Sequence, residues 1–287
     1  MDINKYKVHY DSSFSFKNYP SSENKKSKND DIKNNIIPKL TDELHTLHLK
    51  LHAEEENGIL VVLQALDAAG KDEVISYIFS NLSAQGLKTT SFGKPNETER
   101  KHDYLWRFHE GLPERGQIGI LNRSYYEDVL APRIHDLVEA KETPDSAEEK
   151  NIWHTRYRQI NDYERYLTEN GFIVIKFFFN MSYEEQRNRL IERMTNPEKN
   201  WEFSFNDVKE RQYWDDYQAI FKEMLEETST EHSPWYVLPA DDEWHTRQIV
   251  TEVMIDTIKQ LKPEFPTISD EDKADLDKAL DMLKNEK

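Results

Sequence analysis

Residues 59–72 read Ile59-Leu60-Val61-Val62-Leu63-Gln64-Ala65-Leu66-Asp67-Ala68-Ala69-Gly70-Lys71-Asp72. The apolar start of this stretch is typical of a buried strand, and a turn of small residues follows that ends in Gly70-Lys71. A helical pattern comes next, with Ile75, Ile78, Phe79 and Leu82 on one face. Strand, small-residue turn and helix together form the layout of a phosphate cradle, in which backbone N–H groups face the anion and a lysine adds charge.

The turn departs from the strict P-loop pattern at two positions. Ala65 stands where that pattern has its first glycine, and Asp72 replaces the Ser or Thr that would hold Mg²⁺. An ordinary turn between strand and helix is therefore the alternative interpretation. The acid at Asp67, inside the loop, favours phosphate binding.

Composition limits the class of protein. The 287 residues, 37% of them hydrophobic, are enough for one substantial core or two modest ones. The chain has no window long enough to span a bilayer, no signal-peptide pattern and no Cys, which excludes disulfides and cysteine-ligated zinc. A net charge of −17 argues against a nucleic-acid binder, which needs a basic face. We expect a cytoplasmic enzyme without membrane or nucleic-acid partners.

The order of elements predicts an α/β fold with a parallel sheet covered on both faces. Short apolar runs predict buried strands at residues 59–66, 89–92, 118–121, 172–179 and 235–238. Apolar stripes at helical spacing lie between and after them, one through Trp153, Tyr157, Ile160, Tyr163 and Leu167 and one through Val250, Met254, Ile258 and Leu261. We divide the chain into an N-terminal arm (1–41), a catalytic domain (42–262) with a charged helical lid at about 184–225, and an acidic, partly helical tail (263–287).

A second polar cluster follows the predicted strand at 118–121. Ligands of parallel α/β sheets bind at the carboxyl ends of the strands, so Asn122 and Arg123 are expected beside the phosphate turn. A helix cap at Asn122 or Ser124 is the alternative interpretation, and it leaves the arginine unexplained. P-loop enzymes commonly have a metal-binding Asp at this position. Because Asn122 is neutral, Mg²⁺ would depend on Asp67, on Asp72 through water, and on substrate phosphates.

Six segments, in order along the chain, resemble polyphosphate kinase family 2: residues 63–72, 102–107, 112–116, 122–130, 197–201 and 210–217. The resemblance extends from about Asp42 to Leu261. It implies a P-loop kinase-like three-layer sandwich with a five-stranded parallel sheet and a helical lid. It also implies phosphoryl transfer between inorganic polyphosphate and nucleoside mono-, di- and triphosphates, with Mg²⁺ (Mn²⁺ as an alternative), in a homo-oligomer, either a dimer or a tetramer.

The resemblance also predicts the site residues. The catalytic residues it implies are Asp67, which is also the metal ligand, Lys71, Arg123 and Arg193. The substrate-binding residues it implies are Ala68, Ala69, Gly70, Asp72, Lys94, Arg107, Arg115, Asn122, Glu127, Arg133 and Arg189. Elementary chemistry agrees, because phosphoryl transfer needs positioning and positive charge around the transferring oxygens. Arg189 and Arg193 are four residues apart and share one helix face, although solvated surface charges are an equal alternative for them.

The segment 122–128 is most similar to the branch of the family that accepts both mono- and diphosphates, where a glutamate occupies the Glu127 position. A helix-start role for Glu127 is the alternative interpretation. Glu73, Ala65 and Glu202 depart from the family pattern. Two other classes therefore stay open: an ATP-dependent nucleotide kinase, and a catalytically weak phosphate- or nucleotide-binding regulator.

Overall fold

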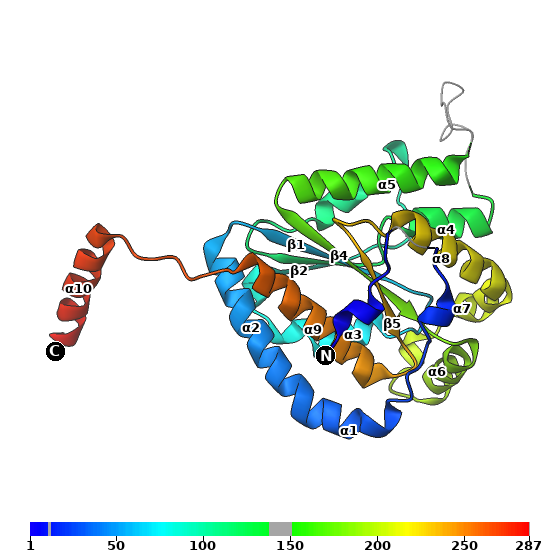
Figure 1. Ribbon diagram of the computed structural model, residues 1–287, viewed down its shortest axis with the longest axis horizontal. Helices are drawn as coiled ribbons and strands as arrows, with labels where there is room; N and C mark the ends of the chain where they lie inside the picture. The colour runs from blue at the N-terminus through cyan, green and yellow to red at the C-terminus, as the bar shows by residue number, and fades with distance from the viewer. Residues whose placement is uncertain (11–12, 138–150, 287) are drawn as a thin grey trace.

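A parallel sheet forms the centre of the computed structural model, which describes residues 1–10, 13–137 and 151–286 (Figure 1). The strand order is β2-β3-β1-β4-β5, and every neighbouring pair is parallel. The strands are β1 (Gly58–Gln64), β2 (Leu87–Ser91), β3 (Ile118–Asn122), β4 (Phe172–Asn180) and β5 (Trp235–Pro239). Each predicted apolar run forms one of these strands, so the predicted five-stranded parallel sheet is confirmed.

Helices cover both faces of the sheet, which gives three layers (Figure 1). One face carries α2 (Ile37–Glu54), α3 (Lys71–Tyr77) and α9 (Glu243–Leu261), and the other carries α4 (Glu127–Ile134), α5 (Ile152–Glu169) and α8 (Trp214–Thr228). Successive residues of β1 alternate between the two cores, with Val61 in the first and Leu60 and Val62 in the second. Burial on both faces explains why β1 is an unbroken apolar run.

The helix after the phosphate loop is shorter than predicted. α3 ends at Tyr77, and a separate 3₁₀ turn follows at Phe79–Asn81. Asn81 Nδ2 donates to the Tyr77 carbonyl at 2.7 Å, so a side chain competes for a carbonyl that a longer helix would use. Ile78 and Phe79 still reach the core, where both are fully buried.

The N-terminal segment lies along the edge of the sheet before the chain enters its first long helix. Lys7 pairs with Tyr236 of β5 in an antiparallel bridge, and the Val8 N–H donates to the Trp235 carbonyl at 2.8 Å. Backbone groups at this edge are thereby paired within the chain. Next, α1 (Asn29–Asp31), a π-helical turn and α2 follow without a break. This helix continues through residues 41 and 42, the expected boundary between arm and catalytic domain. Our division of the chain into arm, domain and tail remains a prediction.

The predicted lid region contains α6 (Tyr183–Thr195), α7 (Phe205–Glu210) and most of α8. Phe221, Met224 and Leu225 of α8 are buried in the core below the sheet, whereas α6 and α7 lie beyond the carboxyl ends of the strands (Figure 1). Motion of this region as a lid remains a prediction. The last helix, α10 (Asp270–Lys284), stands apart from the body (Figure 1). In the described parts of the chain, no helix is both long and apolar enough to cross a bilayer.

Candidate active site

The phosphate loop, residues 65–70, joins β1 to α3 at the carboxyl edge of the sheet. Ala68 and Gly70 have φ angles of +67° and +101°, which lie in the left-handed region. Glycine adopts that region without steric cost, whereas it is sparsely populated for alanine. Backbone strain of this kind is frequent where a loop is shaped for a ligand.

Lys71, the first residue of α3, is buried against this loop. Its Nζ donates to the carbonyls of Ala65 and Leu66, each at 3.3 Å. Burial lowers the pKa of Lys71, and the nearby Asp67 carboxylate opposes that effect. The structure therefore holds a desolvated cation at the base of the loop, where an anionic phosphate would stabilise it.

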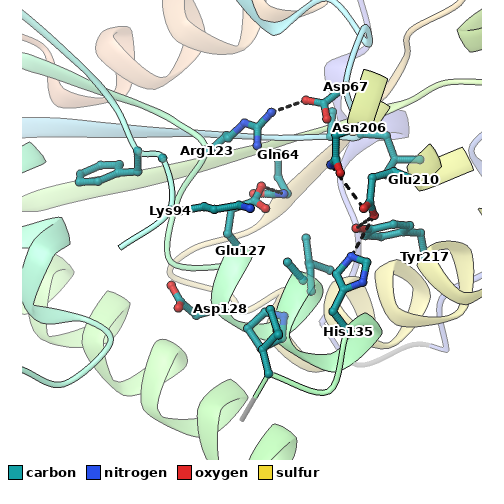
Figure 2. Close-up of a pocket in the computed structure, with 18 of the residues that line it drawn as sticks. Gln64, Asp67, Lys94, Arg123, Glu127, Asp128, His135, Asn206, Glu210 and Tyr217 are labelled. Atoms are coloured by element: carbon teal, nitrogen blue, oxygen red, sulfur yellow. Dashed lines mark hydrogen bonds and ion pairs between the residues drawn. The ribbon is translucent and has the colours of Figure 1, made fainter. Parts of the chain in front are cut away.

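Asn122 and Arg123 lie beside the phosphate loop, at the end of β3. Arg123 has a φ angle of +64° and forms an ion pair with Asp67. Asn122 Nδ2 donates to Asp72 Oδ1 at 2.6 Å. These two contacts join the end of β3 to the loop after β1, and Figure 2 shows the Arg123 guanidinium directed toward Asp67. The structure thus brings together four of the predicted residues with Lys71.

A pocket of about 770 Å³ opens beyond the carboxyl ends of β1, β2 and β3 (Figure 2). The predicted site residues that line it are Asp67, Lys94, Arg107, Arg123 and Glu127. Apolar side chains from α4 and α8 line it as well, among them Leu130, Pro132, Trp214 and Phe221. A pocket with cations and an apolar wall suits a ligand that carries both phosphates and an aromatic ring.

Gln64, the last residue of β1, contacts the predicted acceptor residue in this pocket. Its Nε2 donates to Glu127 Oε1 at 2.8 Å, and the glutamine is 1% exposed. We did not predict Gln64 from the sequence. The available signal was a single amide at the end of an otherwise apolar strand.

Arg107 and Asp128 form a second polar group on the wall of the pocket. Arg107 donates to Asp128 Oδ2 at 3.2 Å and to the Gly93 carbonyl at 2.8 Å. Burial raises the pKa of Asp128 to about 6, against the opposing charges of Arg107 and Arg156. Arg107 therefore ties the loop after β2, which carries Lys94, to the start of α4.

The two predicted lid arginines make contacts within the protein. Arg189 donates to Glu185 Oε1 at 3.0 Å, to the Ala68 carbonyl at 3.1 Å and to the Ala240 carbonyl at 2.6 Å. Arg193 forms ion pairs with Glu202 at 3.2 Å and with Asp207 at 3.4 Å. Arg189 therefore touches the phosphate loop directly.

Asp207 of α7 connects Arg193 with the site. This carboxylate lines the pocket, and burial together with the charge of Asp67 raises its pKa above the ordinary value. A cation that neutralised Asp67 or Asp207 would relieve this repulsion. The lid side of the pocket is thus electrostatically coupled to the phosphate-loop acid.

Glu210 of α7 also lines the pocket. Its carboxylate lies 3.1 Å from His135 Nε2 and accepts from the Tyr217 hydroxyl at 2.9 Å (Figure 2). His135 follows α4, so this group joins α4 to the lid region. The sequence placed Glu210 in a family segment but assigned it no role.

A buried ion pair supports the segment that leads into α4. Lys176 of β4 and Glu164 of α5 are fully buried, with Nζ 2.5 Å from Oε2. The same lysine donates to the Tyr126 hydroxyl at 3.1 Å and to the Thr228 carbonyl at 2.6 Å. Glu164 Oε1 also accepts from the hydroxyls of Tyr125 and Tyr126, at 2.9 and 2.8 Å. All three ammonium hydrogens have acceptors, so the network is satisfied.

Two predicted substrate-binding residues neither line the pocket nor contact the phosphate loop. Arg115 donates to the carbonyls of Glu56 and Asn170, at 2.7 and 2.8 Å. It precedes β3, and the parallel arrangement therefore puts it at the amino edge of the sheet, opposite the phosphate loop. Arg133 pairs with Glu223 of α8 at 2.8 Å and does not line the pocket. It follows Glu127 by six residues, a rotation of about 240° that turns it to another helix face.

The donor set is compatible with Mg²⁺ held largely by substrate. Among the residues that the structure describes, there is no group of three or more His, Asp or Glu side chains able to hold a metal. Mg²⁺ is commonly bound through one or two carboxylates plus substrate phosphates and water. Asp67, a partly exposed carboxylate now paired with Arg123, would be such a ligand, and Asp72 accepts from Asn122.

Comparison with known proteins supplies independent information. The sequence profile described as Polyphosphate kinase 2 matches residues 25–266. An ADP-polyphosphate phosphotransferase of Rhodopseudomonas palustris is 46% identical over 225 residues, 78% of each chain. An AMP/ADP-polyphosphate phosphotransferase of Meiothermus ruber is 42% identical over 223 residues, 78% of this chain and 80% of the relative. The crystal structure of polyphosphate kinase 2 from Arthrobacter aurescens TC1 superposes with a TM-score of 0.86 at 34% identity, covering 96% of this chain and 95% of that one.

Proposed function

The chain belongs to the polyphosphate kinase 2 family and is a polyphosphate-dependent nucleotide phosphotransferase, and we propose that it accepts both nucleoside monophosphates and nucleoside diphosphates. The observation that carries this proposal is the meeting of Asp67, Lys71 and Arg123 at one edge of the sheet, beside a pocket with an apolar wall. The cations suit the phosphates of both substrates, and the wall suits a nucleoside.

In the proposed reaction, a terminal oxygen of the acceptor nucleotide attacks the terminal phosphorus of polyphosphate. The bond from that phosphorus to the bridging oxygen breaks, and the chain leaves one unit shorter. The attacking oxygen is already ionised at neutral pH, so no general base is required. Lys71 and Arg123 stabilise the charge on the transferring oxygens, and Arg193 joins them when its carboxylate partners release it.

Members of this family generally need a divalent metal, and we propose Mg²⁺, with Mn²⁺ as a substitute. Asp67 would hold it together with phosphate oxygens, and the bound ion would neutralise charge between the phosphoryl groups. The ion pair of Arg123 with Asp67 is compatible with this role, because a partly exposed carboxylate can exchange its partner.

Acceptor choice is the finer part of the proposal. Glu127 lies on the pocket wall at the start of α4, where its carboxylate can hold a metal or water beside the acceptor phosphate. That arrangement would tolerate a shorter or a longer phosphate chain. The relative from Meiothermus ruber, which carries both acceptors in its name, is 42% identical over most of both chains, and this supports the proposal.

A coupled assay tests the function. AMP, ADP, GMP and GDP are each incubated with polyphosphate and Mg²⁺ in the absence of ATP. We expect nucleoside di- and triphosphate products. No transfer to any acceptor by folded protein would favour the regulator hypothesis, and transfer only from ATP would favour a nucleotide kinase. Comparing Glu127→Asn with the parent on AMP and ADP then tests acceptor choice, since an equal effect on both contradicts it.

Other properties remain proposals that rest on the family resemblance. We propose a homo-oligomer, either a dimer or a tetramer, and a cytoplasmic location. Light scattering coupled to size-exclusion chromatography tests the first, and a monomer at micromolar concentration would contradict it. Fractionation of source cells tests the second.

A further inference from the structure

Gln64 is an unusual residue for its position. It ends the central strand β1, in which every residue is buried, and it is itself 1% exposed. Its α-carbon follows Leu63, the residue paired with Asn122 of β3. A buried amide at this point of the sheet costs free energy unless both of its polar atoms have partners.

Among the described residues, one of these two atoms has a partner and the other has none. Gln64 Nε2 donates to Glu127 Oε1 at 2.8 Å, and in the described part of the chain no donor lies within hydrogen-bond distance of Gln64 Oε1. The amide orientation is unambiguous, because only the nitrogen can face a carboxylate. The side chain is therefore oriented so that its nitrogen reaches Glu127 while its own oxygen has no hydrogen bond. This arrangement costs folding free energy.

The hydrogen bond from Gln64 orients the Glu127 side chain, whereas other contacts hold the backbone of α4 in place. Glu127 begins α4, which is anchored by the buried side chains of Val129 and Leu130 and by the Glu127 N–H, which donates to the Ser124 carbonyl at 2.9 Å. The backbone is thus placed without Gln64. Within the described residues, the bond from Gln64 is the one side-chain hydrogen bond to the Glu127 carboxylate, and Glu127 itself lines the pocket.

We propose that Gln64 is a positioning residue that determines acceptor choice by orienting the Glu127 carboxylate. This inference rests on the acceptor role of Glu127 proposed above. Gln64 fixes one carboxylate oxygen, and the other is thereby aimed at the place where the acceptor phosphate, or the water and metal beside it, must lie. Without the amide, the carboxylate samples other rotamers and no longer serves both acceptors equally, so the balance between the monophosphate and the diphosphate changes.

The test is a double-mutant cycle on the ratio of kcat/KM for AMP to kcat/KM for ADP. Gln64→Met removes the amide at nearly constant length, and we expect it to change this ratio about tenfold, in the same direction as Glu127→Ala. That fold-change is in the range of a hydrogen bond to a charged group. In the Glu127→Ala background, the same substitution should change the ratio less than twofold. A ratio that shifts equally in both backgrounds would overturn the proposal.

A matched control is Gln186→Met. Gln186 is also a buried glutamine on the pocket wall, but its Nε2 donates to the Asp67 carbonyl at 3.2 Å. We expect this control to affect AMP and ADP equally. Gln64→Asn keeps a buried amide and is one methylene too short to reach Glu127, so it should shift the ratio as Gln64→Met does even if the methionine variant folds poorly. An unchanged ratio in Gln64→Asn would count against the proposal.

The outcomes separate this inference from the proposed function. If Glu127→Ala leaves the ratio unchanged, the acceptor role of Glu127 fails, and the inference about Gln64 fails with it. If Glu127→Ala changes the ratio but neither Gln64 variant does, only the positioning role of Gln64 is wrong. Thermal unfolding of each variant identifies any loss that comes from folding.

Discussion

Replacing Lys71 with methionine should separate catalysis from folding. Lys71 lies under the phosphate loop, with its ammonium bonded to two loop carbonyls at 3.3 Å. Removal of one preorganised charge donor typically costs about 10²–10³ in kcat. Two hydrogen bonds at that length stabilise the fold only weakly, and the desolvation cost of the buried ammonium offsets that stabilisation. The free energy of unfolding of Lys71→Met should therefore differ from the parent's by no more than about 1 kcal/mol.

The pKa shift of Lys71 also predicts how the stability difference between the parent and Lys71→Met changes with pH. Burial lowers the folded-state pKa of Lys71 below that of the unfolded chain, so between the two pKa values the unfolded chain binds more protons. The cost of the buried charge is therefore fully present below the folded pKa and vanishes as the pH rises to about 10.4, the ordinary lysine pKa. The parent should gain stability relative to Lys71→Met as the pH rises through this window.

The assays are steady-state transfer from polyphosphate to ADP and urea unfolding at several pH values. Lys88→Met is the matched control, because Lys88 is half-buried on β2 and donates to the Leu112 carbonyl at 3.0 Å, outside the pocket. The control should retain the parent's kcat. A kcat within threefold of the parent in Lys71→Met would remove Lys71 from the site. A stability difference that does not change with pH would refute the burial argument.

Three further predictions concern the lid, the amino edge of the sheet and the buried ion pair. Arg193→Ala should lower kcat by roughly 10³–10⁵ if this arginine reaches the transferring phosphoryl group, and a loss below tenfold would make the lid arginine structural. Arg115→Ala should lower Tm by about 2–4 °C for each kcal/mol of unfolding free energy lost, and it should leave the KM for polyphosphate unchanged. A raised KM would contradict a purely structural role at the amino edge of the sheet. Glu164→Gln should lower the free energy of unfolding in urea by about 3–5 kcal/mol because it leaves the Lys176 charge unpaired. Adding Lys176→Met should restore most of that stability, and a loss that persists in the double variant would contradict this account.

The sheet and the phosphate loop could be predicted because their signals are local. A strand buried on both faces must be continuously apolar, and a loop with φ near +100° at one residue favours glycine there, as at Gly70. The proximity of Asn122 and Arg123 to that loop followed from the rule that parallel strands end at one edge. Each of these inferences needs only the order of elements.

The side-chain network could not be predicted because its partners are distant in sequence. Lys176 looks like a polar interruption of an apolar run, and only the packing of α5 against β4 reveals Glu164 as its counter-charge. Gln64 and Glu127 are 63 residues apart and meet through the same kind of packing. The substrate-binding role of Arg115 remains a prediction, although the residue lies at the amino edge of the sheet. Family order located its segment, but the order of segments does not say at which end of a strand a side chain lies.

The pairing of the N-terminal segment with β5 has a consequence for synthesis in the cell. The chain emerges N-terminus first, yet the bond from Val8 to Trp235 and the bonds from Ser21 and Ser22 to Asp241 and Asp242 join residues about 220 positions apart. A segment synthesised early therefore waits for a strand synthesised much later, and contacts of such separation form late. Docking of this segment follows the synthesis of β5, and a nascent chain arrested before β5 would expose both the unpaired segment and the open edge of β4.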